Sequence, residues 1–129
     1  MSDPLQPCRA LIVEDDPGIR RLVQKVLQRN GIEIDTAHDG KIAIEKIRNG
    51  RYSVIVLDLM LPEASGYEII EFIKRSGTLT PVAVVSAVSQ QALTKLDPDV
   101  VKLVISKPFD VHELTKAITA LCRREDGAA

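Results

Sequence analysis

The sequence is poor in the features that mark several protein classes. Its 129 residues contain no tryptophan, only 3% aromatic residues and a formal net charge of -1. That charge gives no reason to expect binding to nucleic acid or to an anionic membrane. No apolar segment approaches the roughly 20 residues of a transmembrane helix, and none resembles a signal peptide. We therefore expect a cytoplasmic protein without membrane contact or direct nucleic-acid binding.

Cysteine is scarce too, because only Cys8 and Cys122 are present, near opposite ends of the chain. A disulfide framework of the kind found in small secreted domains is thereby excluded. The two residues could form a bridge if the last helix packs beside the first strand. In a reducing cytosol, however, the expected state is two free, buried thiols that act as small apolar residues.

Apolar residues make up 45% of the chain, which is enough for one hydrophobic core at this length. We expect one domain over residues 8–124, with flexible ends at 1–7 and 125–129. Residues 10–13, 54–57, 82–85 and 100–105 form short apolar runs, as expected for strands buried on both faces of a parallel sheet. Residues 32–36 alternate between apolar and polar, which indicates a strand near a sheet edge.

Helices are predicted between these runs, from capping residues and apolar periodicity. The expected segments start at Asp16, Asp39, Ser65, Gln90 and Asp110. The fourth is the weakest, because Pro98 should end it before Asp97. Strand–helix alternation predicts an α/β fold: a doubly wound, five-stranded parallel sheet in the flavodoxin-like order 2-1-3-4-5, with helices on both faces.

Acidic residues directly follow two of the predicted strands. Glu14 and Asp15 follow the first strand and Asp58 follows the third, and these strands are neighbours at the switch point of this topology. Three carboxylates in one crevice repel one another and call for a cation. Hard oxygen ligands in this number suit Mg²⁺. Asp16 precedes Pro17 and is expected to cap the helix instead of binding metal.

Two further polar residues follow the last two predicted strands, Ser86 after the fourth and Lys107 after the fifth. A metal and a lysine can hold phosphoryl oxygens while a carboxylate attacks phosphorus. Asp58 is the predicted nucleophile, with Lys107 and the Ser86 hydroxyl in contact with the phosphoryl group.

These segments together resemble the receiver domain of two-component response regulators. The resemblance rests on residues 11–16, on residues 56–62 with Gly66, on Ser86-Ala87 and on Lys107-Pro108-Phe109, and it covers residues 8–124. It implies a phosphorelay signalling switch that accepts a phosphoryl group from a histidine kinase or a histidine phosphotransfer protein. It also implies dependence on Mg²⁺, slow autodephosphorylation, and an unknown downstream protein or fused output domain.

The resemblance also implies a role for each site residue. Asp58 matches the phosphoacceptor, Asp15 the direct metal ligand, and Glu14 the acidic residue that acts through metal-bound water. Met60 would give its backbone carbonyl to the metal. Ser86 and Lys107 match the hydroxyl and lysine positions, and the bond from Lys107 to Pro108 is expected to be cis.

Two positions depart from the family pattern. Val104 stands where the family usually has an aromatic residue or histidine, so the usual coupling between that ring and the hydroxyl residue is in doubt. Asp97-Pro98-Asp99 replaces a small Gly-Ala segment before the fifth strand. We therefore do not assume the dimer modes of the family.

Three alternatives stay open at this stage. A pseudo-receiver would bind partners constitutively, without phosphorylation. A haloacid-dehalogenase-like phosphatase would also form an aspartyl phosphate, but its usual Asp-x-Asp is absent, because Leu59 and Met60 follow Asp58. A flavin or dinucleotide site is disfavoured, because no Gly-rich loop follows the first strand.

Overall fold

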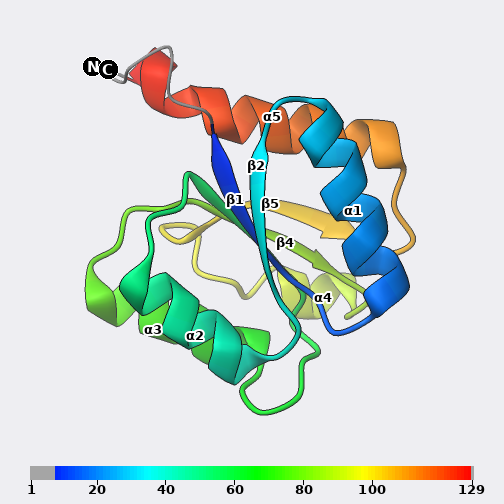
Figure 1. The fold of residues 1–129 in the computed structure, drawn as a ribbon. Coiled ribbons are helices and arrows are strands. Elements are labelled where there is room, and N and C mark those ends of the chain that lie inside the picture. Colours follow the sequence, from blue (N-terminus) through cyan, green and yellow to red (C-terminus); the bar gives the residue numbers. More distant parts are fainter. Residues whose placement is uncertain (1–7, 129) are drawn as a thin grey trace.

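Five parallel strands alternate with five helices in the computed structural model, which describes residues 8–128 (Figure 1). The expected flexible segment 1–7 lies outside these residues. The sheet order is β2-β1-β3-β4-β5, which confirms the predicted fold class and topology. In chain order the elements are β1 (Arg9–Val13), α1 (Pro17–Arg29), β2 (Glu33–Ala37), α2 (Gly40–Asn49), β3 (Val54–Leu57), α3 (Gly66–Ser76), β4 (Val82–Ser86), α4 (Gln90–Leu93), β5 (Val101–Ser106) and α5 (Val111–Ala128).

Side-chain caps fix where the helices begin. The Asp16 carboxylate accepts hydrogen bonds from the N–H groups of Gly18 and Ile19, and Asp39 accepts one from Ile42. The N-caps of α3 and α5 are the predicted residues Ser65 and Asp110. Each cap satisfies backbone donors that have no partner inside the helix. The capping residues therefore fix where the loop after each strand ends and the next helix begins.

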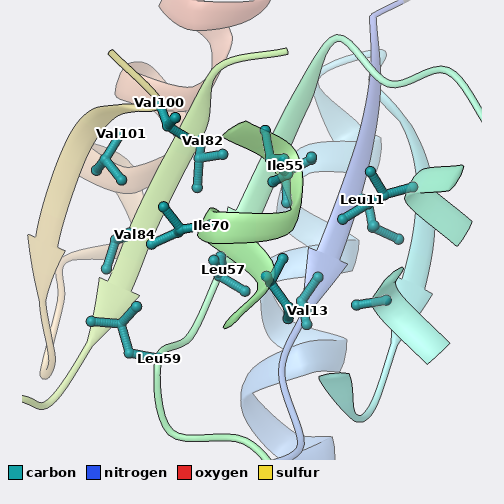
Figure 2. Close-up of a cluster of buried hydrophobic side chains, with 14 of the residues drawn as sticks. Leu11, Val13, Ile55, Leu57, Leu59, Ile70, Val82, Val84, Val100 and Val101 are labelled. Atoms are coloured by element: carbon teal, nitrogen blue, oxygen red, sulfur yellow. The ribbon is translucent and has the colours of Figure 1, made fainter. Parts of the chain in front are cut away.

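Two apolar layers cover the two faces of the sheet. One layer packs α2 and α3 against the sheet, with Leu11, Ile55 and Leu57 at its centre (Figure 2). The other layer packs α1 and α5 on the opposite face, through residues such as Leu27 and Ile118. All four residues of β3 are buried, as predicted for a strand covered on both sides. The loop that follows β3 is therefore anchored to the most buried part of the protein.

The structure differs from the sequence prediction at the C-terminal elements. The run 100–105 was expected to be buried on both faces, but β5 lies at the edge that the predicted strand order gave it, and Val104 is exposed there. α4 ends at Leu93, earlier than predicted, because a single buried leucine does not sustain a longer helix. α5 extends to Ala128, into the segment 125–129 for which a flexible end was expected.

The prediction of free thiols was wrong, because Cys8 and Cys122 form a disulfide. Cys8 directly precedes β1, and α5 packs against the apolar layer to which β1 also contributes side chains. This packing is the arrangement under which the sequence allowed a bridge. Among the described residues no free cysteine remains.

A polar network braces the start of β3 against the edge of the sheet. The Tyr52 hydroxyl donates to Asp35 Oδ2 at 2.8 Å, and Lys46 Nζ lies 2.8 Å from Asp35 Oδ1. Burial opposes ionisation of Asp35, but the hydrogen bonds from Lys46 and Tyr52 outweigh it and lower its pKa. Burial and the neighbouring Asp35 raise the pKa of Tyr52 to about 12, so the phenol stays a donor at neutral pH. The network therefore ties β2, α2 and the β3 entrance together.

We expect Tyr52→Phe to lower the free energy of unfolding by about 1–2 kcal/mol, because a charged acceptor loses its donor. Tyr67→Phe is the matched control, since Tyr67 is 45% exposed, and its effect should stay within about 0.5 kcal/mol. Urea unfolding followed by circular dichroism at pH 7 measures both. Equal effects of the two substitutions would contradict a role for this hydrogen bond.

The same pair has a predicted pH dependence. Because the folded pKa of Asp35 lies below its ordinary value of 3.8, its stabilisation is present above that pH and is lost as the pH falls through the folded pKa. The difference between the parent protein and Tyr52→Phe should thus be constant from about pH 7 to 5 and shrink below about pH 4. Urea titrations at each pH test this expectation.

Candidate functional site

The carboxyl ends of β1 and β3 bring the three predicted acidic residues together. Val13 is the register partner of Leu57, and the Asp58 N–H donates to the Val13 carbonyl at 3.0 Å. Each of Glu14, Asp15 and Asp58 offers a carboxylate oxygen, and these oxygens lie within 4.8 Å of one another. Glu14 and Asp58 are buried, whereas Asp15 is exposed. The cluster is thus open to solvent through Asp15.

Lys107 reaches into the same cluster from the end of β5. Its Nζ lies 2.6 Å from Glu14 Oε1 and 3.0 Å from Asp58 Oδ2. The Lys107 N–H donates to the Ser86 carbonyl at 2.9 Å, which fixes the backbone beside β4. The bond from Lys107 to Pro108 is cis, as the resemblance implied. One ammonium group therefore bridges carboxylates that follow two different strands.

Asp58 is held by hydrogen bonds on both carboxylate oxygens. Oδ1 accepts from the Ser86 hydroxyl at 2.9 Å and from the Met60 N–H at 3.1 Å, and Oδ2 faces Lys107. Ser86 is fully buried, so its hydroxyl is aimed at the site and not at solvent. The polar side chains predicted for the site thus meet around Asp58. Met60, whose backbone carbonyl was the predicted metal ligand, donates its N–H to Asp58, and the residue is 64% exposed.

The electrostatics leave the cluster with an excess of negative charge. Burial raises the pKa of Glu14, and the charge of Asp58 acts in the same direction against the hydrogen bonds from Lys107 and the Asp16 backbone. Burial by itself would lower the pKa of Lys107, but hydrogen bonds to Glu14 and Asp58 outweigh it and raise the pKa. The lysine is therefore held as a cation between two carboxylates, and three acidic groups face one fixed positive charge.

This donor set fits a divalent cation with oxygen preference. Glu14, Asp15 and Asp58 can supply carboxylate oxygens from one side, and the exposed position of Asp15 leaves room for water ligands. Mg²⁺ prefers such sites, which combine one or two carboxylates with water and phosphate oxygens. Asp16 stays outside the cluster and caps α1, as predicted.

The Arg20 contacts were not recognised from the sequence, and Gly66 was noted only as part of the resemblance, without its steric role. Arg20, in α1, donates from Nη1 to the carbonyls of Glu14 at 2.9 Å and Asp15 at 3.3 Å, so it clamps the loop that carries the acidic residues. The only signal was a basic residue one turn into the helix. A Cβ on Gly66 would lie 2.5 Å from the Leu59 Cα and 2.6 Å from the Asp58 carbonyl oxygen, so α3 can approach the loop after β3 only with glycine there.

The comparisons with known proteins agree with this geometry. Residues 10–119 match the model of the response regulator receiver domain. The chain therefore belongs to the response regulator receiver domain family. It is also 35% identical, over 119 residues, to the response regulator ArlR of Staphylococcus saprophyticus, an alignment that covers 91% of this chain and 53% of ArlR. The chain spans about half the length of the curated relatives it matches.

Solved structures of response regulators have the same fold as this chain. The receiver domain of the Francisella response regulator 1452 is 29% identical with a TM-score of 0.86, covering 93% of this chain and 99% of that one. The response regulator TrrA from Thermotoga maritima, solved in complex with Mg²⁺-BeF, is 31% identical with a TM-score of 0.79. That match covers 88% of this chain and 98% of TrrA.

We expect Lys107→Met to lower the free energy of unfolding by about 3 kcal/mol in the presence of EDTA, because it leaves buried carboxylates without their cation. Lys102→Met is the control within β5, where the lysine is exposed and, among the described residues, hydrogen-bonds only the Pro98 carbonyl. Its effect should stay within about 0.5 kcal/mol. Urea unfolding measures both variants.

Adding Asp58→Asn to Lys107→Met should restore part of the lost stability, since one of the unpaired charges is removed. Equal stability of the single and double variants would show that the Lys107–Asp58 contact does not hold the site together.

Proposed function

We propose that this domain is a phosphorelay signalling switch that accepts a phosphoryl group on Asp58. The observation that carries the proposal is the convergence of Lys107, Ser86 and three carboxylates on the Asp58 side chain. Asp58 is the carboxylate that both the hydroxyl and the ammonium contact. The TrrA complex supports the same assignment, because a relative of this fold takes Mg²⁺ with a beryllofluoride group.

Each side chain has a defined part in the proposed reaction. An Asp58 carboxylate oxygen attacks phosphorus while the donor's leaving group departs, which leaves an acyl phosphate. Lys107 and the Ser86 hydroxyl then exchange contacts with the carboxylate for contacts with phosphoryl oxygens. Glu14, Asp15, Asp58 and the Met60 carbonyl would hold Mg²⁺, which supplies charge neutralisation for the phosphoryl oxygens.

The proposed phosphodonor is a histidine kinase or a histidine phosphotransfer protein. The functional unit is proposed to be residues 8–124, acting in the cytoplasm on an unknown downstream protein or on a fused output domain. No direct contact of this segment with nucleic acid or membrane is proposed. In the described part of the chain, no helix has the length and apolarity needed to cross a membrane. The chemistry is limited to acceptance of the phosphoryl group and its slow autohydrolysis, with no turnover of an external substrate.

A constitutive pseudo-receiver is the less favoured reading. Such a protein has no need for a complete acidic site, whereas here Lys107 salt-bridges two of three clustered carboxylates. A haloacid-dehalogenase-like phosphatase is likewise disfavoured by the family match over residues 10–119.

Incubation with Mg²⁺ and acetyl phosphate should add one phosphoryl group to the parent protein, detected by intact-mass spectrometry. Asp58→Asn should gain none, and Lys107→Ala should gain much less. Asp39→Asn is the control, because Asp39 caps α2 away from the cluster and asparagine keeps the cap. An unchanged mass of the parent protein would favour the pseudo-receiver.

Mg²⁺ binding should distinguish two adjacent acidic residues. Asp15→Asn removes a carboxylate of the cluster and should weaken Mg²⁺ binding at least about 10-fold. Asp16→Asn keeps the helix cap and should bind within about 2-fold of the parent protein. Amide shifts in an NMR titration with MgCl₂ report both affinities. Similar losses in the two variants would contradict the assignment of Asp15.

A further inference from the structure

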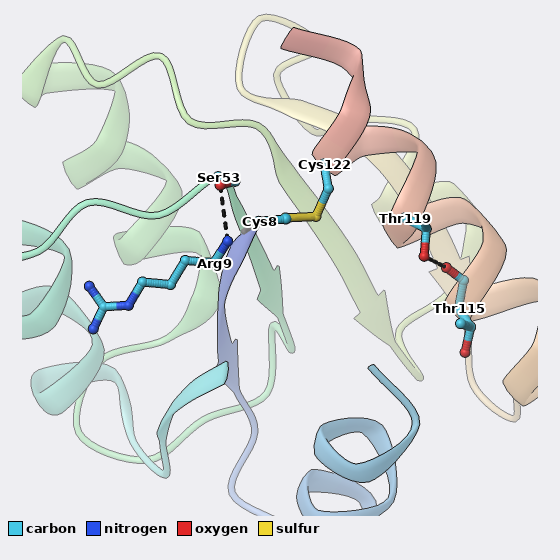
Figure 3. Close-up of a disulfide and its surroundings, with 6 residues drawn as sticks. All are labelled: Cys8, Arg9, Ser53, Thr115, Thr119 and Cys122. Carbon is cyan, nitrogen blue, oxygen red and sulfur yellow. Dashed lines mark hydrogen bonds between the residues drawn. A yellow bond between two sulfur atoms is a disulfide. The ribbon is translucent and has the colours of Figure 1, made fainter. Parts of the chain in front are cut away.

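The disulfide joins two elements that are far apart in sequence. Cys8 and Cys122 are separated by 114 residues, and their Cα atoms lie 5.6 Å apart (Figure 3). This separation is within the range that a disulfide spans without backbone movement. The bond connects the start of β1 to the C-terminal half of α5.

Contacts other than the bond hold both cysteines in place. The Cys8 carbonyl accepts the Glu33 N–H at 2.9 Å. The Arg9 N–H donates to Ser53 Oγ at 3.1 Å, as Figure 3 shows. Cys8 is thereby tied to β2 and to the start of β3. On α5, the buried residues Ile118 and Leu121 precede Cys122 and anchor the helix to the sheet. The two sulfur atoms therefore stay neighbours when the bond is open.

Both cysteines are only partly buried against this apolar layer. We propose that Cys8 and Cys122 form a reversible redox site that is oxidised by small-molecule disulfides of the glutathione class. The proposal rests on the cytoplasmic location proposed above, because disulfides in that compartment are usually transient and redox-sensing. A partly exposed pair is also more open to exchange than a fully buried structural bridge.

The reaction is balanced as two thiol–disulfide exchanges. One cysteine thiolate attacks a sulfur of oxidised glutathione, which breaks its S–S bond and releases one glutathione thiolate. The second cysteine, after losing its proton, attacks the protein sulfur of the mixed disulfide and displaces the second glutathione. The two protein thiols lose two electrons, oxidised glutathione gains them, and the two protons end on the two reduced glutathiones.

The bond changes how firmly β1 and α5 are held together. At the opposite end of β1, Glu14 forms the ion pair with Lys107, which lies just before α5. In the oxidised state the two segments are connected covalently at one end and ionically at the other. Reduction releases only the end distant from Asp58. The redox state thus sets the stability of the α5 attachment and leaves the site assembled.

The test uses the full chain equilibrated in buffers of oxidised or reduced glutathione. Thiol titration after quenching should find no free thiols in the oxidised native protein and two after reduction, without unfolding. The thermal midpoint should be on the order of 10 °C higher in the oxidised form, because the bond closes a loop of more than about 100 residues. Hydrogen exchange of α5 amides should be slower in that form.

Cys8→Ala/Cys122→Ala is the control, and its midpoint should be the same in both buffers. Thiols that stay free in excess oxidised glutathione, or a stable glutathione adduct by mass, would overturn the proposal. A bond that resists excess reduced glutathione until the protein unfolds would also overturn it, since the bridge would then be permanent.

Phosphoryl acceptance measured on the same samples separates this proposal from the proposed function. The double cysteine variant should gain one phosphoryl group with acetyl phosphate and Mg²⁺, as the parent protein does in both redox states. Loss of that gain in all samples, with the redox transition intact, would reject the function alone. A normal gain without a redox transition would reject the redox site alone.

Discussion

The structure depends on the position of one ammonium group. Lys107 Nζ lies between Glu14 and Asp58, both of which are almost completely buried. Buried carboxylates of this kind are tolerated only with a partner that returns the free energy lost on leaving water. Because these carboxylates follow β1 and β3 and the lysine follows β5, the ion pairs connect the centre of the sheet with one of its edges. The same contacts that stabilise the carboxyl edge also define the chemistry available there.

The parallel strand order brings residues that are distant in the sequence together at one end of the sheet. β3 pairs with β1 on one side and β4 on the other, so the residues after these strands emerge side by side. Asp58 therefore receives the Ser86 hydroxyl from β4 while its backbone N–H is bound to Val13 in β1. Gly66 completes the support, because only a residue without a Cβ lets α3 approach the backbone of Asp58 and Leu59. The loop is thus fixed from the sheet and from the helix.

The sequence was sufficient for the topology and for the residues that gather at the site, because both follow from periodicity, capping and the carboxyl-end rule for parallel sheets. It was insufficient where the outcome depends on side-chain geometry. The Arg20 clamp and the Asp35–Tyr52 pair require knowledge of which way long side chains turn. Whether Cys8 and Cys122 form a disulfide depended on whether α5 lies beside β1. The expectation of a reducing cytosol led to the wrong prediction of free thiols. The early end of α4 reflects a local balance between one buried leucine and the cost of helix formation.

Val104 stands where the family usually has an aromatic residue or histidine, and this difference has a limited structural effect in this fold. Val104 pairs with Val84 on the edge strand and is 39% exposed, so it contributes to the surface and little to the core. The hydrogen bonds between β4 and β5 beside the site do not involve the Val104 side chain. Ser86 pairs with Ser106, and the Ser86 carbonyl accepts the Lys107 N–H, so the residue with the hydroxyl and the residue with the ammonium group are joined by a backbone hydrogen bond. The absence of a ring at position 104 therefore changes the exposed surface of β5, while the backbone contact between Ser86 and Lys107 is present.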